Sequence, residues 1–213
     1  MTNITKLSFW VLAVSYLVAQ AYGSMPYSFV HKALPIFILL FVALIKLTGP
    51  SRILLSTALF LSATGDILLA LDLQQGFIFG LLAFAFAHLF YTACFYRWQN
   101  WQKHYLWLFA ALAIHLTLML YFILPVSGQL LIPVVIYMGV IAAMTCSAIM
   151  VKTAIRYILF GAVLFVTSDS LLAINKFLFA LPYENILIMS SYYAAQYFLI
   201  LGCIDKASSD AST

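Results

Sequence analysis

Two similar acidic motifs stand far apart in this chain: "GDILLAL" begins at Gly65 and "SDSLLAI" begins at Ser168. In each motif one aspartate, Asp66 or Asp169, interrupts a long apolar run and precedes Leu-Leu-Ala. Two carboxylates in one low-dielectric site do not ionise together, because the charge on one opposes the charge on the other. Such a pair can offer a proton donor and a proton acceptor at the same pH. The motifs therefore predict acid/base chemistry or proton transfer.

Two kinds of function fit a buried carboxylate pair. One is hydrolysis of an acid-labile bond through an oxocarbenium-like transition state, as in glycosidases. The other is a proton relay in a transporter. The sequence contains no serine-hydrolase elbow, no HExxH motif and no glycine-rich phosphate loop. The single histidine in "AFAHLFY" is not a ligand set, so we expect neither a metal nor a cofactor.

The composition places this chemistry in a membrane. Of the 213 residues, 66% are hydrophobic and 8% are charged, whereas a soluble domain carries about 25% charged residues. The net charge of +4 comes without a basic cluster, which argues against a nucleic-acid partner. Cys94, Cys146 and Cys203 lie in separate apolar runs and are typical of small buried residues, not of a disulfide framework.

A helix needs about 20 apolar residues to cross a bilayer. The sequence predicts an all-α bundle of eight such helices in a single transmembrane domain over residues 1–213. The expected spans are about 7–23, 29–47, 53–71, 77–96, 105–124, 130–150, 157–175 and 185–203, followed by a polar tail at 204–213. The first span lacks a small-residue cleavage site, so we interpret it as a retained helix and not as a signal peptide.

Charge predicts the orientation of the bundle. Eight spans place both termini on one side of the membrane. That side carries eight of the ten basic residues, namely Lys6, Lys46, Arg52, Arg97, Lys103, Lys152, Arg156 and Lys206. The other side carries Lys32 and Lys176. By the positive-inside rule both termini are expected in the cytoplasm, at the inner membrane if the source is bacterial. Nothing in the sequence specifies an oligomeric state.

The two acidic motifs have similar surroundings. Arg52 precedes the first aspartate by fourteen residues, Arg156 precedes the second by thirteen, and a proline, Pro35 or Pro133, opens the helix before each motif. The pattern fits a parallel 4+4 repeat, or chance similarity between apolar strings. In both cases the two carboxylates lie at similar depth, about 8 Å inside the non-cytoplasmic surface at 1.5 Å per residue.

A polar cavity is expected around the two aspartates. The other acids, Asp72, Glu184, Asp205 and Asp210, are assigned to loops or the tail. An aspartate at the centre of a span costs about 2.5–3.5 kcal/mol, so a polar environment must receive each one. The same half of the membrane is expected to supply substrate-binding residues, namely Lys32, His88, Tyr91, Tyr137, Ser168, Asn175, Lys176, Tyr193 and Gln196. In a purely structural alternative, Lys176 pairs with Asp169 from two turns further along the same helix.

Several segments together resemble the YhhN-like family of lysoplasmalogenases. They are "KALPIFILL", "SATGDILLAL" with "AFAHLFYTACF", "IPVVIYMGVIAAM", "GAVLFVTSDSLLAINKF" and "SSYYAAQYFLILG". The resemblance extends from the second span to the eighth. It implies an eight-helix membrane hydrolase that cleaves the vinyl ether of a lysoplasmalogen, giving a fatty aldehyde and glycerophosphoethanolamine or glycerophosphocholine. It also implies that Asp66 and Asp169 are the two essential aspartates.

Two points stay open after the resemblance. The first is the lysophospholipid substrate: in a bacterium that makes no plasmalogens, the substrate would be a lysolipid other than a lysoplasmalogen. A proton-coupled transporter or channel that uses the same aspartates is the alternative function, because repeats and intramembrane acids also describe transporters.

From the residues alone, we expect Lys32 and Lys176 to hold the substrate phosphate at the mouth of the cavity, since lysine commonly binds phosphate as a point charge.

Overall fold

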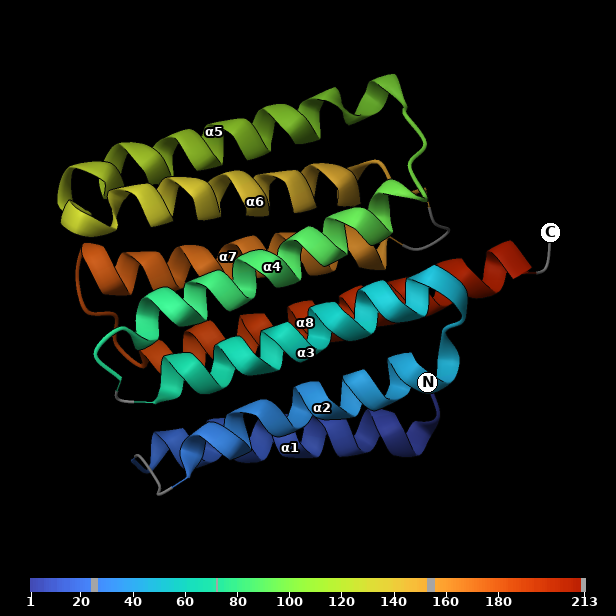
Figure 1. The fold of residues 1–213 in the computed structure, drawn as a ribbon, viewed down its shortest axis with the longest axis horizontal. Coiled ribbons are helices and arrows are strands. Elements are labelled where there is room, and N and C mark those ends of the chain that lie inside the picture. Colours follow the sequence, from blue (N-terminus) through green and yellow to red (C-terminus); the bar gives the residue numbers. More distant parts are fainter. Residues whose placement is uncertain (24–26, 72, 153–155, 212–213) are drawn as a thin grey trace.

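The computed structural model describes residues 1–23, 27–71, 73–152 and 156–211. This part of the chain forms eight long helices and contains no β-strand. All eight helices are long and apolar enough to cross a membrane. Consecutive helices run in opposite directions, and both termini lie at the same end of the bundle (Figure 1). The predicted all-α, eight-helix membrane bundle is therefore confirmed. Asp72, residues 24–26 and 153–155 of two predicted breaks, and the last two residues of the tail lie outside the described residues.

Each of the eight helices overlaps one of the predicted spans. Their bounds are α1 Asn3–Ala21, α2 Ser28–Lys46, α3 Gly49–Ala70, α4 Gly76–Tyr96, α5 Leu106–Ile123, α6 Leu131–Ile149, α7 Tyr157–Phe177 and α8 Glu184–Ala211. Short 3₁₀ turns precede α5 at Lys103–Tyr105 and connect α5 to α6 at Leu124–Val126 and Gly128–Leu130. Each helix thus has at least about the length of 20 residues that is needed to cross a bilayer.

The two prolines that were expected to open helices behave differently. Pro133 lies in the first turn of α6, where a missing backbone N–H leaves no helical hydrogen bond unmade. Pro35 lies inside α2, seven residues after its start, and the helix continues to Lys46. The prediction was wrong for Pro35, because neighbouring helices can satisfy the backbone groups that a proline frees within a membrane helix.

The last helix is longer than expected. Glu184 begins α8, where a carboxylate favours the positive end of the helix dipole, and the helix runs on to Ala211. Lys206 and Asp210, one turn apart on the same face, form an ion pair of 2.6 Å. The polar tail is therefore helical as far as it is described. Glu184, Asp205 and Asp210 belong to α8 and not to loops.

Four helices, α3, α4, α7 and α8, form the centre of the bundle (Figure 1). They are flanked by α1 and α2 on one side and by α5 and α6 on the other. Gly161 lets α7 approach α8 closely, since a Cβ at that position would lie 2.8 Å from the Leu199 nitrogen and 2.9 Å from the Ala195 oxygen. Small residues allow such close contact between membrane helices. At the edge, α5 packs on α6 and α7 and fully buries a single residue, Ile123.

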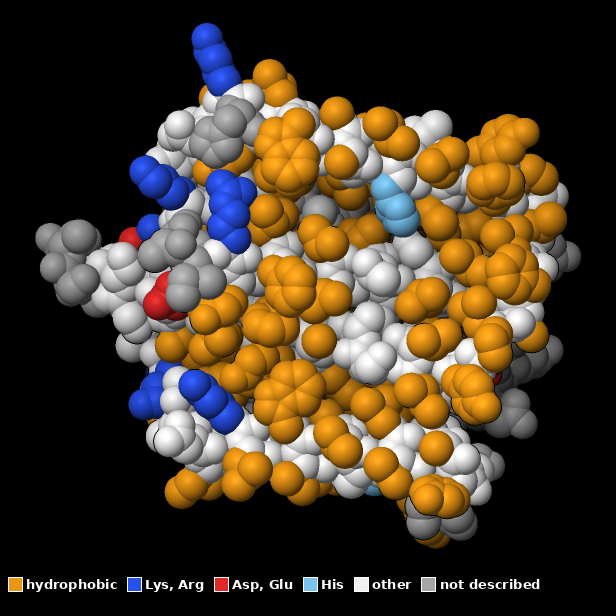
Figure 2. Space-filling view, turned by 180° about the vertical axis from the view of Figure 1, so that it is seen from behind, with side chains coloured by type: hydrophobic (Ala, Val, Ile, Leu, Met, Phe, Trp, Pro, Cys, Tyr) orange, Lys and Arg blue, Asp and Glu red, His pale blue; other side chains and the backbone are white. Residues whose placement is uncertain are grey.

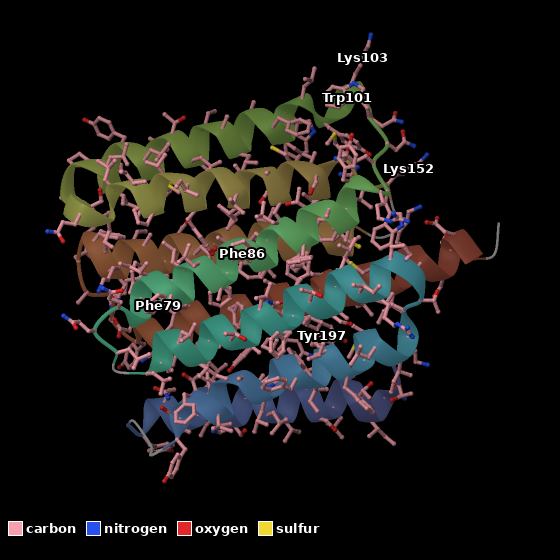
Figure 3. The ribbon with its side chains drawn as sticks, viewed as in Figure 1. Phe79, Phe86, Trp101, Lys103, Lys152 and Tyr197 are labelled. Carbon is pink, nitrogen blue, oxygen red and sulfur yellow. The ribbon has the colours of Figure 1, made fainter. Side chains whose placement is uncertain are left out.

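The surface has the pattern of a bilayer-spanning protein. On the face shown in Figure 2, apolar side chains cover the middle, and lysines and arginines gather at one end. Phe79 and Phe86 project outward from α4, with about half of each side chain exposed, whereas Trp101, Lys103 and Lys152 lie at the end that holds the termini (Figure 3). The basic end of the bundle is therefore the end with the termini.

Candidate active site

Both aspartates lie in the half of the bundle away from the termini. Asp66 precedes the last residue of α3 by four positions, and Asp169 precedes the last residue of α7 by eight. Because α3 and α7 run in the same direction, both carboxylates approach the same end of the bundle. The Asp66 side chain is 2% exposed, so its charge must be compensated within the protein.

A single cavity of about 170 Å³ receives both carboxylates, which is room for several water molecules. It lies among α2, α3, α4, α7 and α8. Six of the residues that were expected in the site line it: Lys32, Asp66, Ser168, Asp169, Asn175 and Lys176. The two acidic motifs, far apart in sequence, therefore share one polar space.

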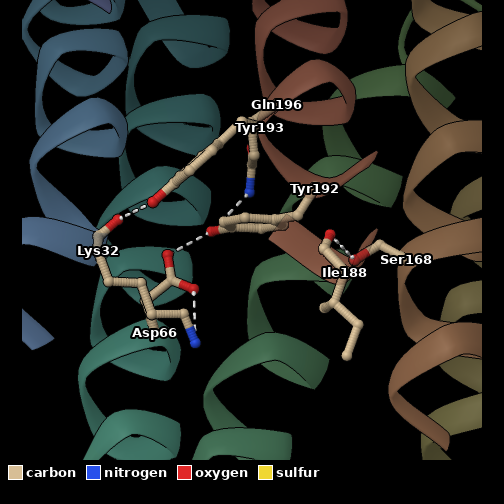
Figure 4. A network of polar contacts seen from close by, with 7 residues as sticks. All are labelled: Lys32, Asp66, Ser168, Ile188, Tyr192, Tyr193 and Gln196. Atoms are coloured by element: carbon tan, nitrogen blue, oxygen red, sulfur yellow. Dashed lines mark hydrogen bonds and ion pairs between the residues drawn. The ribbon is translucent and has the colours of Figure 1, made fainter. Parts of the chain in front are cut away.

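Asp66 is held by a phenol and a lysine. The Tyr192 hydroxyl donates a hydrogen bond of 2.7 Å to Asp66 Oδ2, and the Lys32 Nζ lies 3.8 Å from Oδ1 (Figure 4). The Lys32 side chain is 12% exposed. Lys32 thus lies inside the cavity as the counter-ion of Asp66, and not at its mouth as the sequence suggested.

A chain of hydrogen bonds fixes the direction of the Tyr192 hydroxyl. The Tyr91 hydroxyl donates to Gln196 Oε1 at 2.6 Å, so the amide carbonyl of Gln196 is already used as an acceptor. The Gln196 amide nitrogen then donates to the Tyr192 hydroxyl oxygen at 3.4 Å (Figure 4). Because Tyr192 accepts from Gln196, its own proton is free to point at Asp66. The chain therefore presents Asp66 with a donor in a fixed position.

Asp169 has a different environment. The Tyr137 hydroxyl donates to Asp169 Oδ2 at 2.6 Å. Within the described part of the chain, the ion pairs shorter than 4 Å are Lys32–Asp66 and Lys206–Asp210. Lys176, which was considered as a partner of Asp169, instead places its Nζ 5.0 Å from the ring centre of Phe77. Lys176 is exposed and lines the outer part of the cavity, so it is the lysine at the mouth.

Asp169 also lines a second pocket, which is apolar. That pocket lies among α4, α5, α6 and α7, and its other polar lining residues are Tyr137 and Ser170. Phe77, Asp169 and Leu172 line both the polar cavity and the apolar pocket. Asp169 therefore stands where a polar space meets an apolar one.

Four of the expected residues lie behind the cavity wall. His88, Tyr91, Tyr193 and Gln196 are buried but are not among its lining residues. The His88 Nδ1 lies 2.6 Å from the Phe84 carbonyl oxygen, and the Tyr193 hydroxyl donates to the Lys32 carbonyl at 2.8 Å. These contacts support the wall, and any contact with substrate stays a prediction for them.

Two of the lining residues also serve the backbone. The Ser168 hydroxyl donates to the Ile188 carbonyl at 3.0 Å (Figure 4), and the Asn175 side-chain oxygen accepts from the Leu181 nitrogen at 2.8 Å. The first bond joins the middle of α7 to the second turn of α8, and the second joins the end of α7 to the connection between the two helices.

Sequence reasoning missed Tyr192, Glu184 and Asn185, all of which line the cavity from α8. It chose the neighbouring phenol, Tyr193, on the basis of its three-residue spacing from Gln196. The four-residue spacing from Tyr192 to Gln196 is an equally good signal for a shared helix face. Glu184 was missed because it was expected in a loop, and Asn185 because it was expected only as the first residue of the last span.

Taken together, the fold and site define a multi-pass integral membrane protein with two carboxylates in one cavity within the helix bundle. The chain belongs to the YhhN family, whose family model matches residues 27–203. It is 33% identical over 190 residues to lysoplasmalogenase TMEM86A of Bos taurus, covering 82% of this chain and 77% of that protein. It is 34% identical to lysoplasmalogenase TMEM86A of Homo sapiens, with the same coverage.

A bacterial relative shows similar identity. The chain is 32% identical over 160 residues to a lysoplasmalogenase of Mycobacterium tuberculosis, covering 72% of this chain and 61% of that protein. No solved structure matches the chain.

Proposed function

We propose that this protein is a lysoplasmalogenase that uses Asp66 and Asp169 as an acid/base pair. It hydrolyses the vinyl ether of a lysoplasmalogen to a fatty aldehyde and glycerophosphoethanolamine or glycerophosphocholine. The observation that carries the proposal is the single cavity lined by both carboxylates. The names of the vertebrate and mycobacterial relatives support the substrate.

The chemistry of a vinyl ether matches a carboxylate pair. Its hydrolysis begins when an acid protonates the alkene carbon that is not bonded to oxygen, which leaves an oxocarbenium ion. Water adds to that ion, and the hemiacetal separates into aldehyde and alcohol. The site must supply one carboxylic acid and one carboxylate. A positioned acid or base contributes about 10²–10⁴-fold to the rate, and an anion beside the developing cation adds electrostatic stabilisation.

The membrane position is part of the proposal. The whole chain acts as one transmembrane domain, with both termini in the cytoplasm and the cavity near the opposite surface. The basic residues at the end that holds the termini support this orientation (Figure 2). The internal 4+4 repeat stays a prediction.

The outer part of the cavity suits a zwitterionic headgroup. Lys176 offers a cation for phosphate, and Glu184, in the first turn of α8, offers an anion for the ethanolamine or choline nitrogen. Asn175 and Asn185 add amide groups that can donate or accept hydrogen bonds at the same mouth. We therefore assign the polar cavity to the glycerophospho part of the substrate.

The experiment measures aldehyde release by purified protein in detergent from lysoplasmenylethanolamine. The saturated-ether analogue, which has no alkene to protonate, serves as the unreactive control. Asp66→Asn and Asp169→Asn should each lose about 10²–10⁴-fold in kcat and still bind the saturated ether. Absence of aldehyde, together with proton flux in proteoliposomes, would instead support a proton-coupled transporter.

A further inference from the structure

The two aspartates stand in different relations to the two pockets. Asp66 lines the polar cavity, whereas Asp169 lines both the polar cavity and the apolar pocket. Opposite α7, aliphatic side chains of α4, α5 and α6 line the apolar pocket, among them Leu81, Leu116, Met119, Val134, Met138 and Ile141. Asp169 is thus shared by both pockets, whereas Asp66 lines only the one that also holds the charged residues Lys32, Lys176 and Glu184.

A lysoplasmalogen has a matching division. Its glycerophospho group is polar, its alkenyl chain is apolar, and the vinyl ether joins the two. On the basis of the proposed function, we infer that the chain occupies the apolar pocket and the headgroup occupies the polar cavity. Asp169 then lies at the vinyl ether and is the acid that protonates the chain-side carbon, while Asp66 is the carboxylate that faces the oxygen-bearing carbon.

Charge compensation within the site supports the same division of roles. An ionised Asp66 has the Lys32 ammonium 3.8 Å away and the Tyr192 hydroxyl at 2.7 Å. For Asp169 the described residues supply the Tyr137 hydroxyl and no ion pair within 4 Å. Asp169 is partly buried, and a carboxylate removed from water without a counter-ion costs more free energy than the neutral acid does. Tyr137 donates to Oδ2 of Asp169, which leaves Oδ1 to carry the proton.

The proton and electron balance closes over one cycle. The Asp169 proton and the alkene π electrons form the new C–H bond, and an oxygen lone pair completes the oxocarbenium ion. Water adds to the oxygen-bearing carbon and gives its proton to Asp66. In the hemiacetal, the hydroxyl group gives its proton to Asp169 and becomes the aldehyde oxygen as the carbon–oxygen bond to glycerol breaks. The leaving glycerol oxygen takes the proton from Asp66. Both carboxyl groups return to their starting states.

The first test of these roles measures binding and needs no turnover. The probe is a lysophospholipid in which a secondary ammonium replaces the vinyl ether, a mimic of the oxocarbenium charge. The saturated ether is the neutral reference, and it also reports whether each variant is folded. Asp66→Asn should weaken the ammonium probe at least about tenfold relative to the neutral ether, because a buried charge pair is lost. Asp169→Asn should change that ratio by less than about threefold.

The outcomes of this test are distinct. A larger loss in Asp169→Asn than in Asp66→Asn would overturn the assignment, because Asp169 would then be the ionised partner. Equal losses in the two variants would overturn it as well. If the protein releases no aldehyde from any vinyl ether, the proposed function fails, but the binding ratios still decide which carboxylate is ionised.

The second test concerns the chain. Met138→Trp in α6 and Leu116→Phe in α5 narrow the apolar pocket from two walls. Each should lower kcat/KM for an eighteen-carbon lysoplasmalogen by about tenfold or more, since long chains lose buried apolar contact. Each should leave a short-chain vinyl ether within about threefold. Ile136→Trp, also in α6 but with an exposed side chain, is the matched control. Equal effects on long and short chains, or the same effect from Ile136→Trp, would contradict the assignment of the pocket.

Discussion

Tyr192 and Asp66 are 126 positions apart in the sequence, yet the phenol hydroxyl of one donates directly to the carboxylate of the other across α8 and α3. Gln196, four residues beyond Tyr192, holds that hydroxyl from the other side. The position of a reactive carboxylate therefore depends on a residue that carries no charge.

Tyr192→Phe removes this hydrogen bond and keeps the ring. We expect kcat for aldehyde release to fall by about tenfold or more, because a hydrogen bond to a charged group contributes about 1.5–3 kcal/mol. KM should change little, since the lost contact is to Asp66 and not to substrate. Tyr193→Phe is the matched control: it removes the bond to the Lys32 carbonyl and should affect thermal stability more than kcat. Equal kcat values for the two variants would argue against the role of Tyr192.

Lys32→Met separates two roles for this lysine. If Lys32 held phosphate, as the sequence suggested, KM would rise and kcat would stay constant. Because Lys32 is paired with Asp66, we expect kcat to fall and the unfolding free energy to drop by about 3–5 kcal/mol, the usual cost of leaving one buried charge unpaired.

The double variant Lys32→Met/Asp66→Asn gives the control for this prediction. It removes both charges of the Lys32–Asp66 pair. It should therefore recover most of the lost thermal stability in detergent, without recovering activity. A single variant with normal stability and a raised KM would return Lys32 to phosphate binding.

The mouth of the cavity predicts headgroup selectivity. Glu184→Gln should raise KM for lysoplasmenylethanolamine several-fold and leave KM nearly unchanged for an analogue whose phosphate carries no amine. Lys176→Met should raise KM for both, because both retain the phosphate. Steady-state kinetics on the two substrates measure the difference. A Glu184→Gln variant that treats both substrates alike would remove Glu184 from headgroup recognition.

Gly65, the residue before Asp66, is predicted to be required for packing. A Cβ at Gly65 would lie 2.6 Å from the Phe84 ring, and Phe84 lines the cavity and packs edge-on against Tyr192. Gly65→Ala should lower stability by about 1–3 kcal/mol, as overpacking does, and reduce activity through the displaced ring. Gly139→Ala in α6 meets nothing within 4 Å and should keep or slightly raise thermal stability.

Much of the fold was predictable because the bilayer thickness sets the length of each helix, and the free-energy cost of burying a charge in lipid limits where charged residues can lie. The same cost made Asp66 and Asp169 visible as a pair, since a carboxylate in an apolar run needs a polar environment. Their meeting in one cavity followed from their parallel helices and similar depth.

The exact partners depend on helix rotation, which sequence periodicity does not define. Tyr192 and Tyr193 are adjacent, but successive residues point about 100° apart on a helix, and only packing decides which one faces Asp66. Lys32 and Lys176 were both expected at the mouth of the cavity, but Lys32 lies inside it beside Asp66 and only Lys176 is exposed at the mouth, for the same reason. The apolar pocket beside Asp169 was not predicted, because apolar residues that line a pocket look the same in sequence as those that face lipid.

The weakly packed position of α5 has a consequence for the end of the reaction. This helix supplies Leu116, Met119 and Ile123 to the wall of the apolar pocket, and its opposite face is exposed at the edge of the bundle. On the proposed arrangement, α5 separates a fatty aldehyde formed at Asp169 from the surrounding acyl chains on this side of the bundle. The water-soluble glycerol product lies in the other compartment, beside Lys176 and Glu184. The two products would then leave in different directions. The aldehyde would move laterally into the bilayer, and the glycerol product would move out into water, so neither would have to pass the other.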